Sequence, residues 1–231
     1  MSDQPAQFDA YATSYADEVN RSIAFLGVGV DYFTRVKAGY LLDQLASHFG
    51  DTRTLNLLDI GCGTGGCHPL IRGELGGLCG TDVSAASVEQ AAKANPGASY
   101  SPYDGHRLPY EDGQFDAAVT ICVMHHVPPA QWSSFAAEMK RVVRPGGLAL
   151  VFEHNPFNPL TRRAVSNCEF DADAVLLTQR RTKALLAGAG FGAVRSRSIL
   201  SIPSLGPKSR AVDLALGRLC LGAQYVASGT A

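Results

Sequence analysis

The chain has 231 residues, its 20 lysines and arginines nearly balance its 21 aspartates and glutamates, and 46% of its residues are hydrophobic. That length is enough for one α/β domain with a full core, and no polar or repetitive stretch indicates a linker. The nearly neutral charge provides no long-range positive field, so we expect no nucleic-acid partner. No apolar run approaches the roughly 18 to 20 residues of a membrane span, and the first residues lack a signal-peptide pattern. We therefore expect a cytoplasmic protein with no membrane partner.

The first fifty residues carry two helical patterns. Residues 8–26 place aromatic and aliphatic side chains three to four positions apart, which is the period of one helix face. Two glycines interrupt this pattern, and a second helical pattern covers residues 32–49. The first buried strand starts only at about residue 55. We therefore predict that residues 1–50 form a helical lid and residues 51–231 the core of one compact domain.

Residues 57–66 are the most informative stretch of the chain. An apolar run ends on Asp59 and breaks into alternating glycines, which predicts a buried strand that turns sharply into a nucleotide-binding loop. Glycine suits that turn because it adopts positive φ and lets a ligand approach bare backbone. Asp82 ends the next apolar run, at about the twenty-residue spacing at which an acid usually meets a ribose.

Helical and strand patterns alternate along the rest of the chain. Strands are predicted from about residue 55 and over residues 78–82, 98–103, 115–123, 148–153, 193–202 and 223–228, and helices over residues 67–75, 84–94, 130–143, 178–187 and 207–219. Repeated βα units predict a single doubly wound, mostly parallel seven-stranded sheet that binds its ligand at the carboxyl ends of the strands. Residues 155–160 contain two prolines and are predicted to form a rigid loop.

The six cysteines are predicted to be small buried thiols rather than disulfides. Cys62, Cys67 and His68 lie close together, but neither a C-x-x-C pair nor a second ligand pair accompanies them. We therefore predict no metal site.

The glycine loop alone fits two cofactors. Gly61, Gly63 and Gly66 match the dinucleotide fingerprint G-x-G-x-x-G, so an NAD-dependent oxidoreductase is one hypothesis. Asp59 favours the other, because a carboxylate at the mouth of the loop would repel a pyrophosphate and attract the sulfonium and ammonium groups of S-adenosylmethionine.

Five segments resemble the successive motifs of class I S-adenosylmethionine-dependent methyltransferases. They are residues 58–65, 81–84, 108–116, 124–126 and 144–147. The closest likeness is to the small-molecule branch that includes ubiquinone-biosynthesis-type enzymes, also called methyltransferase type 11. The similarity is clear over roughly residues 55–153, and its motifs are specific to the family but not to any substrate.

The resemblance implies a Rossmann-like methyltransferase fold and a set of cofactor-binding residues. Asp59 and Gly61 would hold the aminoacyl end of the cofactor, Asp82 both ribose hydroxyls, and Asp104 with Gly105 the adenine. Arg35 is a candidate partner for the cofactor carboxylate. The other residues predicted to bind the cofactor are Tyr15, Cys62, Gly63, Val83 and Cys122.

Methyl transfer to a hydroxyl needs a base as well as orientation of the nucleophile. His125 and His126 follow the fourth predicted strand, and Glu153 and His154 follow the fifth, so these four residues could converge over the sulfonium. We predict a methyltransferase with a small-molecule acceptor, as a monomer or homodimer. A cofactor-binding family member that promotes other chemistry is a further hypothesis.

Overall fold

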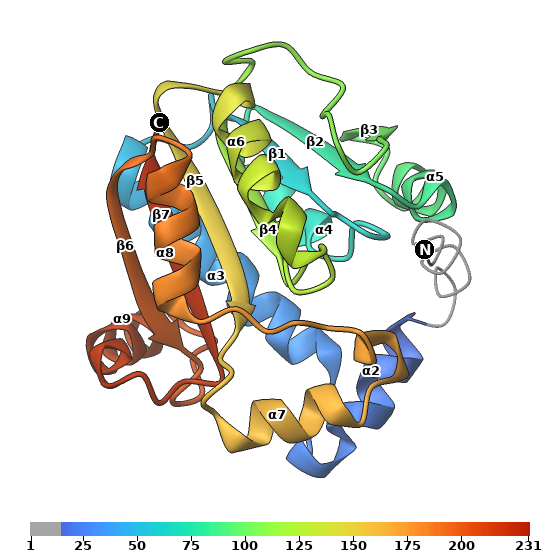
Figure 1. Ribbon diagram of the computed structural model, residues 1–231, viewed down its shortest axis with the longest axis vertical. Coiled ribbons are helices and arrows are strands. Elements are labelled where there is room, and N and C mark those ends of the chain that lie inside the picture. The colour runs from blue at the N-terminus through green and yellow to red at the C-terminus, as the bar shows by residue number, and fades with distance from the viewer. Residues whose placement is uncertain (1–14) are drawn as a thin grey trace.

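A computed structural model describes residues 15–231, in which seven strands form one sheet with helices on both faces (Figure 1). The strand order is β3-β2-β1-β4-β5-β7-β6. Strands β1 to β5 pair in parallel, whereas β7 runs antiparallel to β5 and β6. The strands are β1 (Asn56–Ile60), β2 (Gly77–Asp82), β3 (Ser99–Pro102), β4 (Phe115–Ile121), β5 (Val143–His154), β6 (Gly192–Ile199) and β7 (Gln224–Thr230). The predicted doubly wound, mostly parallel seven-stranded sheet is confirmed.

Along the described residues, helices lie between all consecutive strands except β3 and β4. The α-helices are α2 (Tyr15–Ile23), α3 (Val30–Phe49), α4 (His68–Ile71), α5 (Ala85–Ala94), α6 (Trp132–Val142), α7 (Pro159–Ser166), α8 (Gln179–Gly188) and α9 (Pro207–Leu216). Short 3-10 helices are η1 (Ala24–Leu26), η2 (Arg72–Glu74), η3 (Pro129–Gln131), η4 (Glu169–Asp171) and η5 (Gly217–Leu219). Of the predicted first helix, residues 8–14 lie outside the described residues.

The sheet has a hydrophobic layer on each face, because alternate residues of a strand point to opposite sides. Along β5, Leu150 and Phe152 belong to the layer under α3, whereas Ala149 and Val151 belong to the layer under α6 and α8. The central strands are therefore apolar on both faces, as parallel strands covered by helices require.

The segments beyond the carboxyl ends of the parallel strands surround the candidate active site. Helices α2 and α7 and the turn η4 contact one another there, away from the main helical layers (Figure 1). Helix α3, by contrast, buries Tyr40 and Leu41 against the sheet. The division into a lid of residues 1–50 and a core of residues 51–231 stays a prediction. Within residues 15–231 we find no helix that is long and apolar enough to cross a membrane.

Two local predictions were wrong. The loop predicted for residues 155–160 ends at Asn158, because α7 begins at Pro159. Proline fits the first turn of a helix, where its missing N–H is no loss, and the Asn158 side chain accepts hydrogen bonds from the N–H groups of Leu160 and Thr161. All six cysteines are free thiols, but only Cys168 is buried as predicted. Cys220 is exposed, and the other four, Cys62, Cys67, Cys79 and Cys122, are half-buried.

Candidate active site

The glycine loop follows β1 and is tied to the neighbouring strand. Gly61, Gly63 and Gly65 all have positive φ, at 78°, 53° and 72°. The N–H groups of Gly61 and Cys62 both donate to the carbonyl of Thr81 on β2, at 2.7 and 3.0 Å. A Cβ atom at Gly63 would meet nothing within 4 Å, so open space lies beside the loop at that residue. The predicted strand-to-loop turn is confirmed.

Replacing Gly61 with alanine is expected to lower the free energy of unfolding by about 1–3 kcal/mol, because a non-glycine residue is strained at positive φ. The added Cβ would also lie 2.5 Å from a methyl carbon of Val123. Denaturant unfolding measures the effect, and Gly73→Ala is the matched control. Gly73 lies in η2, and a Cβ there meets nothing within 4 Å. Equal losses in the two variants would contradict this prediction.

Asp82 joins the end of β2 to the glycine loop. Its Oδ2 accepts from the N–H of Gly63 at 2.8 Å, and its Oδ1 accepts from the N–H of Ser84 at 2.9 Å. Burial raises the pKa of Asp82, and the nearby Asp59 carboxylate acts in the same direction, although the backbone donors oppose both. The carboxylate is therefore held in one orientation at the carboxyl end of the sheet.

The predicted adenine residues lie next to Val83. Gly105 has a φ of 81°, and a Cβ there would lie 3.5 Å from a methyl carbon of Val83. Asp104 is exposed, and its Oδ1 accepts from the N–H groups of His106 and Arg107 at 2.8 and 2.9 Å. Those bonds lower the pKa of Asp104. The structure thus brings Val83 and Gly105 together at the end of β2.

Asp59 is buried beneath the loop and paired with a histidine. It is 4% exposed, and its Oδ2 accepts from Nε2 of His68 at 3.0 Å. Nδ1 of His68 hydrogen-bonds the hydroxyl of Tyr100, whose ring stacks on the imidazole. The Oδ1 atom of Asp59 is buried and has no hydrogen-bond partner among residues 15–231. Sequence reasoning missed His68 and Tyr100 as partners of Asp59, and no local spacing signals the contact with β3.

Cys122 directly follows β4. It has a φ of 57°, which is uncommon for a residue other than glycine, and its neighbour Val123 packs against Gly61. Nζ of Lys37, on α3, lies 3.7 Å from Sγ of Cys122. Arg35, the candidate partner of the cofactor carboxylate, is exposed. Tyr15 begins α2, and its side chain lies outside the described part of the structure.

A cavity of about 470 Å³ lies next to Cys122. Helices α2, α3 and α7, η4 and the ends of β4, β5 and β7 supply its walls. Its apolar side chains include Val19, Ile23, Leu26, Phe33, Leu160 and Val165. Its polar groups include Lys37, His125, His126, His154 and Asp171. The cavity is therefore mostly apolar with a polar group of histidines, a composition typical of small-molecule sites.

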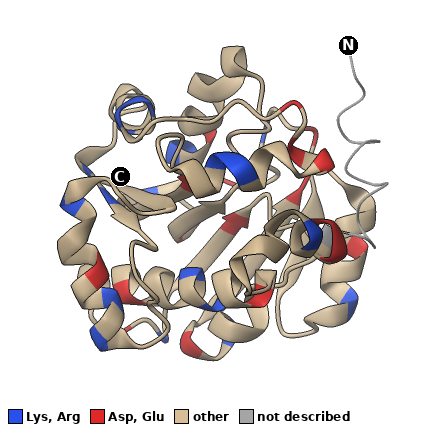
Figure 2. Cartoon of the chain, turned by 90° about the horizontal axis from the view of Figure 1, so that it is seen from below, with Lys and Arg blue, Asp and Glu red and all other residues tan. Residues whose placement is uncertain are grey.

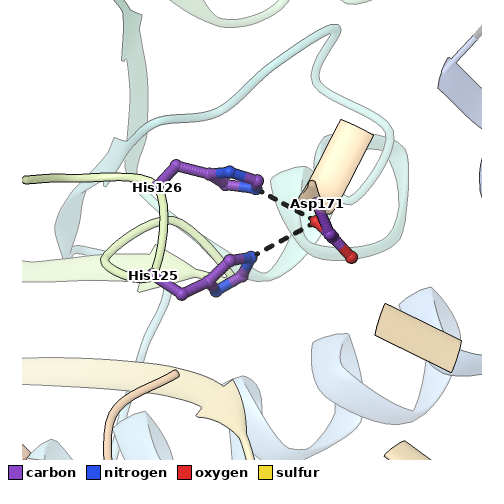
Figure 3. Close-up of side chains that lie close together, drawn as sticks. All are labelled: His125, His126 and Asp171. Atoms are coloured by element: carbon purple, nitrogen blue, oxygen red, sulfur yellow. Dashed lines mark ion pairs between the residues drawn. The ribbon is translucent and has the colours of Figure 1, made fainter. Parts of the chain in front are cut away.

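The structure brings the four predicted catalytic residues together. Nδ1 of His125 lies 2.6 Å from Oε2 of Glu153, and the ring centroid of His125 lies 4.2 Å from that of His126 and 5.0 Å from that of His154. Asp171, which sequence reasoning missed, joins them: its Oδ1 lies 3.7 Å from Nε2 of His125 and 3.4 Å from Nε2 of His126 (Figure 3). No motif marks Asp171, because η4 reaches the histidines only through the path of α7.

The charges in this cluster are unequal. Burial is the largest influence on the pKa of His125 and acts to lower it, but the carboxylates of Glu153 and Asp171 outweigh burial and raise that pKa to about 10. Burial, followed by the charge of His125, lowers the pKa of His126 to about 3 and that of His154 to about 4. Burial acts to raise the pKa values of Glu153 and Asp171, but the His125 charge outweighs it and lowers both. At neutral pH, therefore, His125 is the charged histidine of the cluster.

Two asparagines near the cavity have structural partners. The Nδ2 group of Asn155 donates to the carbonyls of Cys220 and Gly222, at 3.0 and 2.8 Å. Asn158 caps α7 and donates to the carbonyl of Leu221 at 2.9 Å. Both residues tie the chain after β5 to the segment before β7.

Comparison with known proteins assigns the central part of the chain to a protein family. Residues 58–151 match the family model described as a methyltransferase domain. The chain is 35% identical to a ubiquinone biosynthesis O-methyltransferase of Mesorhizobium japonicum over 52% of its own length and 51% of that protein. It is 36% identical to norajmaline N-methyltransferase of Rauvolfia serpentina over 45% of its own length and 38% of that protein. The chain spans about half the length, or less, of these relatives.

The fold agrees with this match. A solved S-adenosylmethionine-dependent methyltransferase of Thermotoga maritima, described as a possible histamine N-methyltransferase, superposes with a TM-score of 0.67 at 20% identity, covering 97% of this chain and 98% of that one. Of the two cofactors that fit the glycine pattern, the family match selects S-adenosylmethionine over NAD. Residues 58–151 are therefore a methyltransferase domain, and the chain has the fold of S-adenosylmethionine-dependent methyltransferases.

Proposed function

We propose that the chain transfers a methyl group from S-adenosylmethionine to an oxygen or nitrogen atom of a small molecule with a large apolar part. The observation that carries this proposal is the mostly apolar cavity of about 470 Å³ beside Cys122. Cys122 lines that cavity, and the adjacent Val123 contacts the glycine loop, so the cavity and the cofactor loop share one wall. An acceptor in the cavity would therefore face the methyl donor.

The residues at the loop fit the cofactor. The open space beside Gly63 leaves room for a ligand against bare backbone, and Asp82 presents a carboxylate at the strand end. We assign the aminoacyl end to the loop at Gly61, Cys62 and Gly63, with the buried Oδ1 of Asp59 as an unused acceptor beneath it. The ribose hydroxyls are assigned to Asp82 and the adenine to the segment with Asp104 and Gly105.

The bound cofactor supplies an activated methyl group, so the protein must orient the acceptor and accept its proton. Of the four predicted candidates for the base, we choose His154. Glu153 is fully buried, the ring nitrogens of His125 face carboxylates at 2.6 and 3.7 Å, and Nε2 of His126 faces Asp171 at 3.4 Å. His154 lines the cavity and is half-buried, so its ring is placed to take a proton from an acceptor.

The distribution of charge supports a small molecule rather than a nucleic acid as acceptor. Figure 2 views the chain from the side on which α2 and α7 lie in Figure 1, and basic and acidic positions are interspersed there. A nucleic-acid acceptor would favour a continuous basic surface. The two curated relatives differ in acceptor atom, since one is named an O-methyltransferase and the other an N-methyltransferase.

Calorimetric titration with S-adenosylhomocysteine tests the cofactor site, and a labelled-methyl assay over phenols and amines with apolar bodies tests the reaction. We expect binding of one cofactor per chain and transfer to at least one acceptor class. No binding at high micromolar concentration would refute the proposal. Cofactor binding without transfer to any acceptor would favour a family member with other chemistry.

Filling the cavity should separate acceptor binding from cofactor binding. Ala164 lines the cavity on α7, so Ala164→Phe is expected to raise the acceptor KM by about tenfold or more while leaving the affinity for S-adenosylhomocysteine unchanged. Ala187→Phe is the control, because Ala187 is exposed on α8. Equal KM values in the two variants would place the acceptor elsewhere.

A further inference from the structure

Three side chains at the cavity wall present nitrogen and oxygen atoms to one point. One ligand atom each of His125, His126 and Asp171 lies within 4.8 Å of the other two. Figure 3 shows both imidazoles directed at the Asp171 carboxylate. The Nε2–Oδ1 distance is 3.7 Å for His125 and 3.4 Å for His126. Atoms bound to one metal ion at about 2.1 Å lie about 3.0 Å apart across an octahedral edge and about 3.4 Å apart across a tetrahedral edge. Small side-chain adjustments would therefore bring these atoms onto a common ion.

Glu153 holds His125 in the orientation that a metal ligand needs. Its Oε2 accepts from Nδ1 of His125 at 2.6 Å, and the carboxylate is fully buried. A carboxylate that accepts from one ring nitrogen fixes the ring and leaves the other nitrogen for a metal, an arrangement common at metal-binding histidines. The Nε2 atom of His125 is the one that faces Asp171, and binding of a cation there would release its proton.

The charge of the cluster also favours a divalent ion. Glu153 and Asp171 place one carboxylate at each ring nitrogen of His125, at 2.6 and 3.7 Å, in a largely buried region. One divalent cation on neutral imidazoles would balance both carboxylates. Two imidazoles and one carboxylate suit first-row transition metals, whereas Mg²⁺ and Ca²⁺ prefer all-oxygen ligand sets.

The three candidate ligands can be reached from the cavity. His125, His126 and Asp171 all line the cavity assigned to the acceptor. Three protein ligands with positions open to a cavity are typical of catalytic rather than structural metal sites.

We propose that His125, His126 and Asp171 bind a divalent transition-metal ion, such as Zn²⁺ or Fe²⁺, whose open positions take an oxygen or nitrogen atom of the acceptor. This assignment replaces the prediction that the chain has no metal site, which considered only Cys62, Cys67 and His68. The ion would orient the acceptor and lower the pKa of its reacting group. That role in catalysis rests on the proposed methyl transfer, whereas the binding of the ion does not.

The test is calorimetric titration of chelator-treated protein with Zn²⁺, with Co²⁺ absorption as a second probe. We expect one Zn²⁺ per chain. In Asp171→Asn and in His126→Gln we expect Zn²⁺ to bind about 100-fold more weakly. Losing a residue that hydrogen-bonds a metal ligand costs roughly 10- to 100-fold in affinity, and losing the ligand itself should cost more. The matched controls are Asp173→Asn, at an exposed residue after η4, and His48→Gln, at a histidine of α3 that contacts the carbonyl of Gly146. Circular dichroism melting verifies that each variant folds.

The comparison between variants decides the outcome, because free thiols elsewhere in the chain could also bind Zn²⁺. Wild-type affinity in the folded Asp171→Asn variant, or no Zn²⁺ binding by the wild type, would overturn the metal site. Titration of the same samples with S-adenosylhomocysteine keeps the two proposals separate. Cofactor binding without Zn²⁺ binding would refute the metal site alone, and Zn²⁺ binding without cofactor binding would refute the proposed methyl transfer alone.

Discussion

The Asp82→Asn variant is expected to bind S-adenosylhomocysteine about 100-fold more weakly than the wild type. Both carboxylate oxygens of Asp82 accept backbone N–H groups, from Gly63 and from Ser84. Asparagine has one carbonyl oxygen, so its NH₂ group would point at one of these donors and leave it without a partner. The unpaired donor and the lost charge toward the ribose together cost about 3 kcal/mol, which corresponds to that change in Kd.

Isothermal calorimetry measures this loss directly, and Glu89→Gln provides the control. Glu89 is exposed on α5 and pairs only with Lys93, one helical turn away, among the ion pairs of residues 15–231. Its replacement removes one negative charge without touching the loop. An unchanged Kd in Asp82→Asn would mean that the ribose is held elsewhere.

The Glu153→Gln variant is expected to lose about 3 kcal/mol of unfolding free energy and most methyl transfer. Glu153 is fully buried and hydrogen-bonded to His125, and removing one partner of a buried ion pair leaves the other without compensation. The Oε1 atom of Glu153 has no hydrogen-bond partner among the described residues. A glutamine NH₂ group at that position would be a buried hydrogen-bond donor without an acceptor.

For a chain of this length the loss corresponds to a fall of about 6–12 °C in melting temperature. Differential scanning calorimetry measures it, with Glu169→Gln as the control because Glu169 is exposed in η4. A melting temperature within about 2 °C of the wild type would show that the buried pair contributes little to stability. Methyl-transfer rates of the same samples, measured well below the melting temperature, report the effect on activity.

Local patterns predicted the glycine loop well. The run that ends at Asp59 is apolar because β1 is covered on both faces, and Gly61 is required where φ is positive and Val123 leaves no room for a Cβ. A helix was predicted to begin at Ser84, and the Ser84 side chain caps α5 by accepting from the N–H of Ser87. These features depend on neighbours in the chain, so residue type and spacing are enough to find them.

The environment of Asp59 could not be predicted in the same way. Sequence reasoning treated Asp59 as an open carboxylate that selects a cationic ligand. In the structure it is 4% exposed and bonded to His68, which is held in turn by Tyr100 from β3. Because Asp59 is buried and already hydrogen-bonded, its carboxylate does not by itself distinguish the two cofactors, and the family match supports S-adenosylmethionine.

The sequence by itself determined the alternation of strands and helices, the glycine loop with Asp82, and the positions of His125 and Glu153 at the ends of neighbouring strands. Each follows from periodicity, from the φ of glycine or from the parallel course of βα units. Only the tertiary structure decided which side chains surround those residues. Asp171 reaches His125 because α7 and η4 fold back over the strand ends, and no residue spacing encodes such a contact. The cavity arises in the same way, since segments far apart in the chain supply its walls.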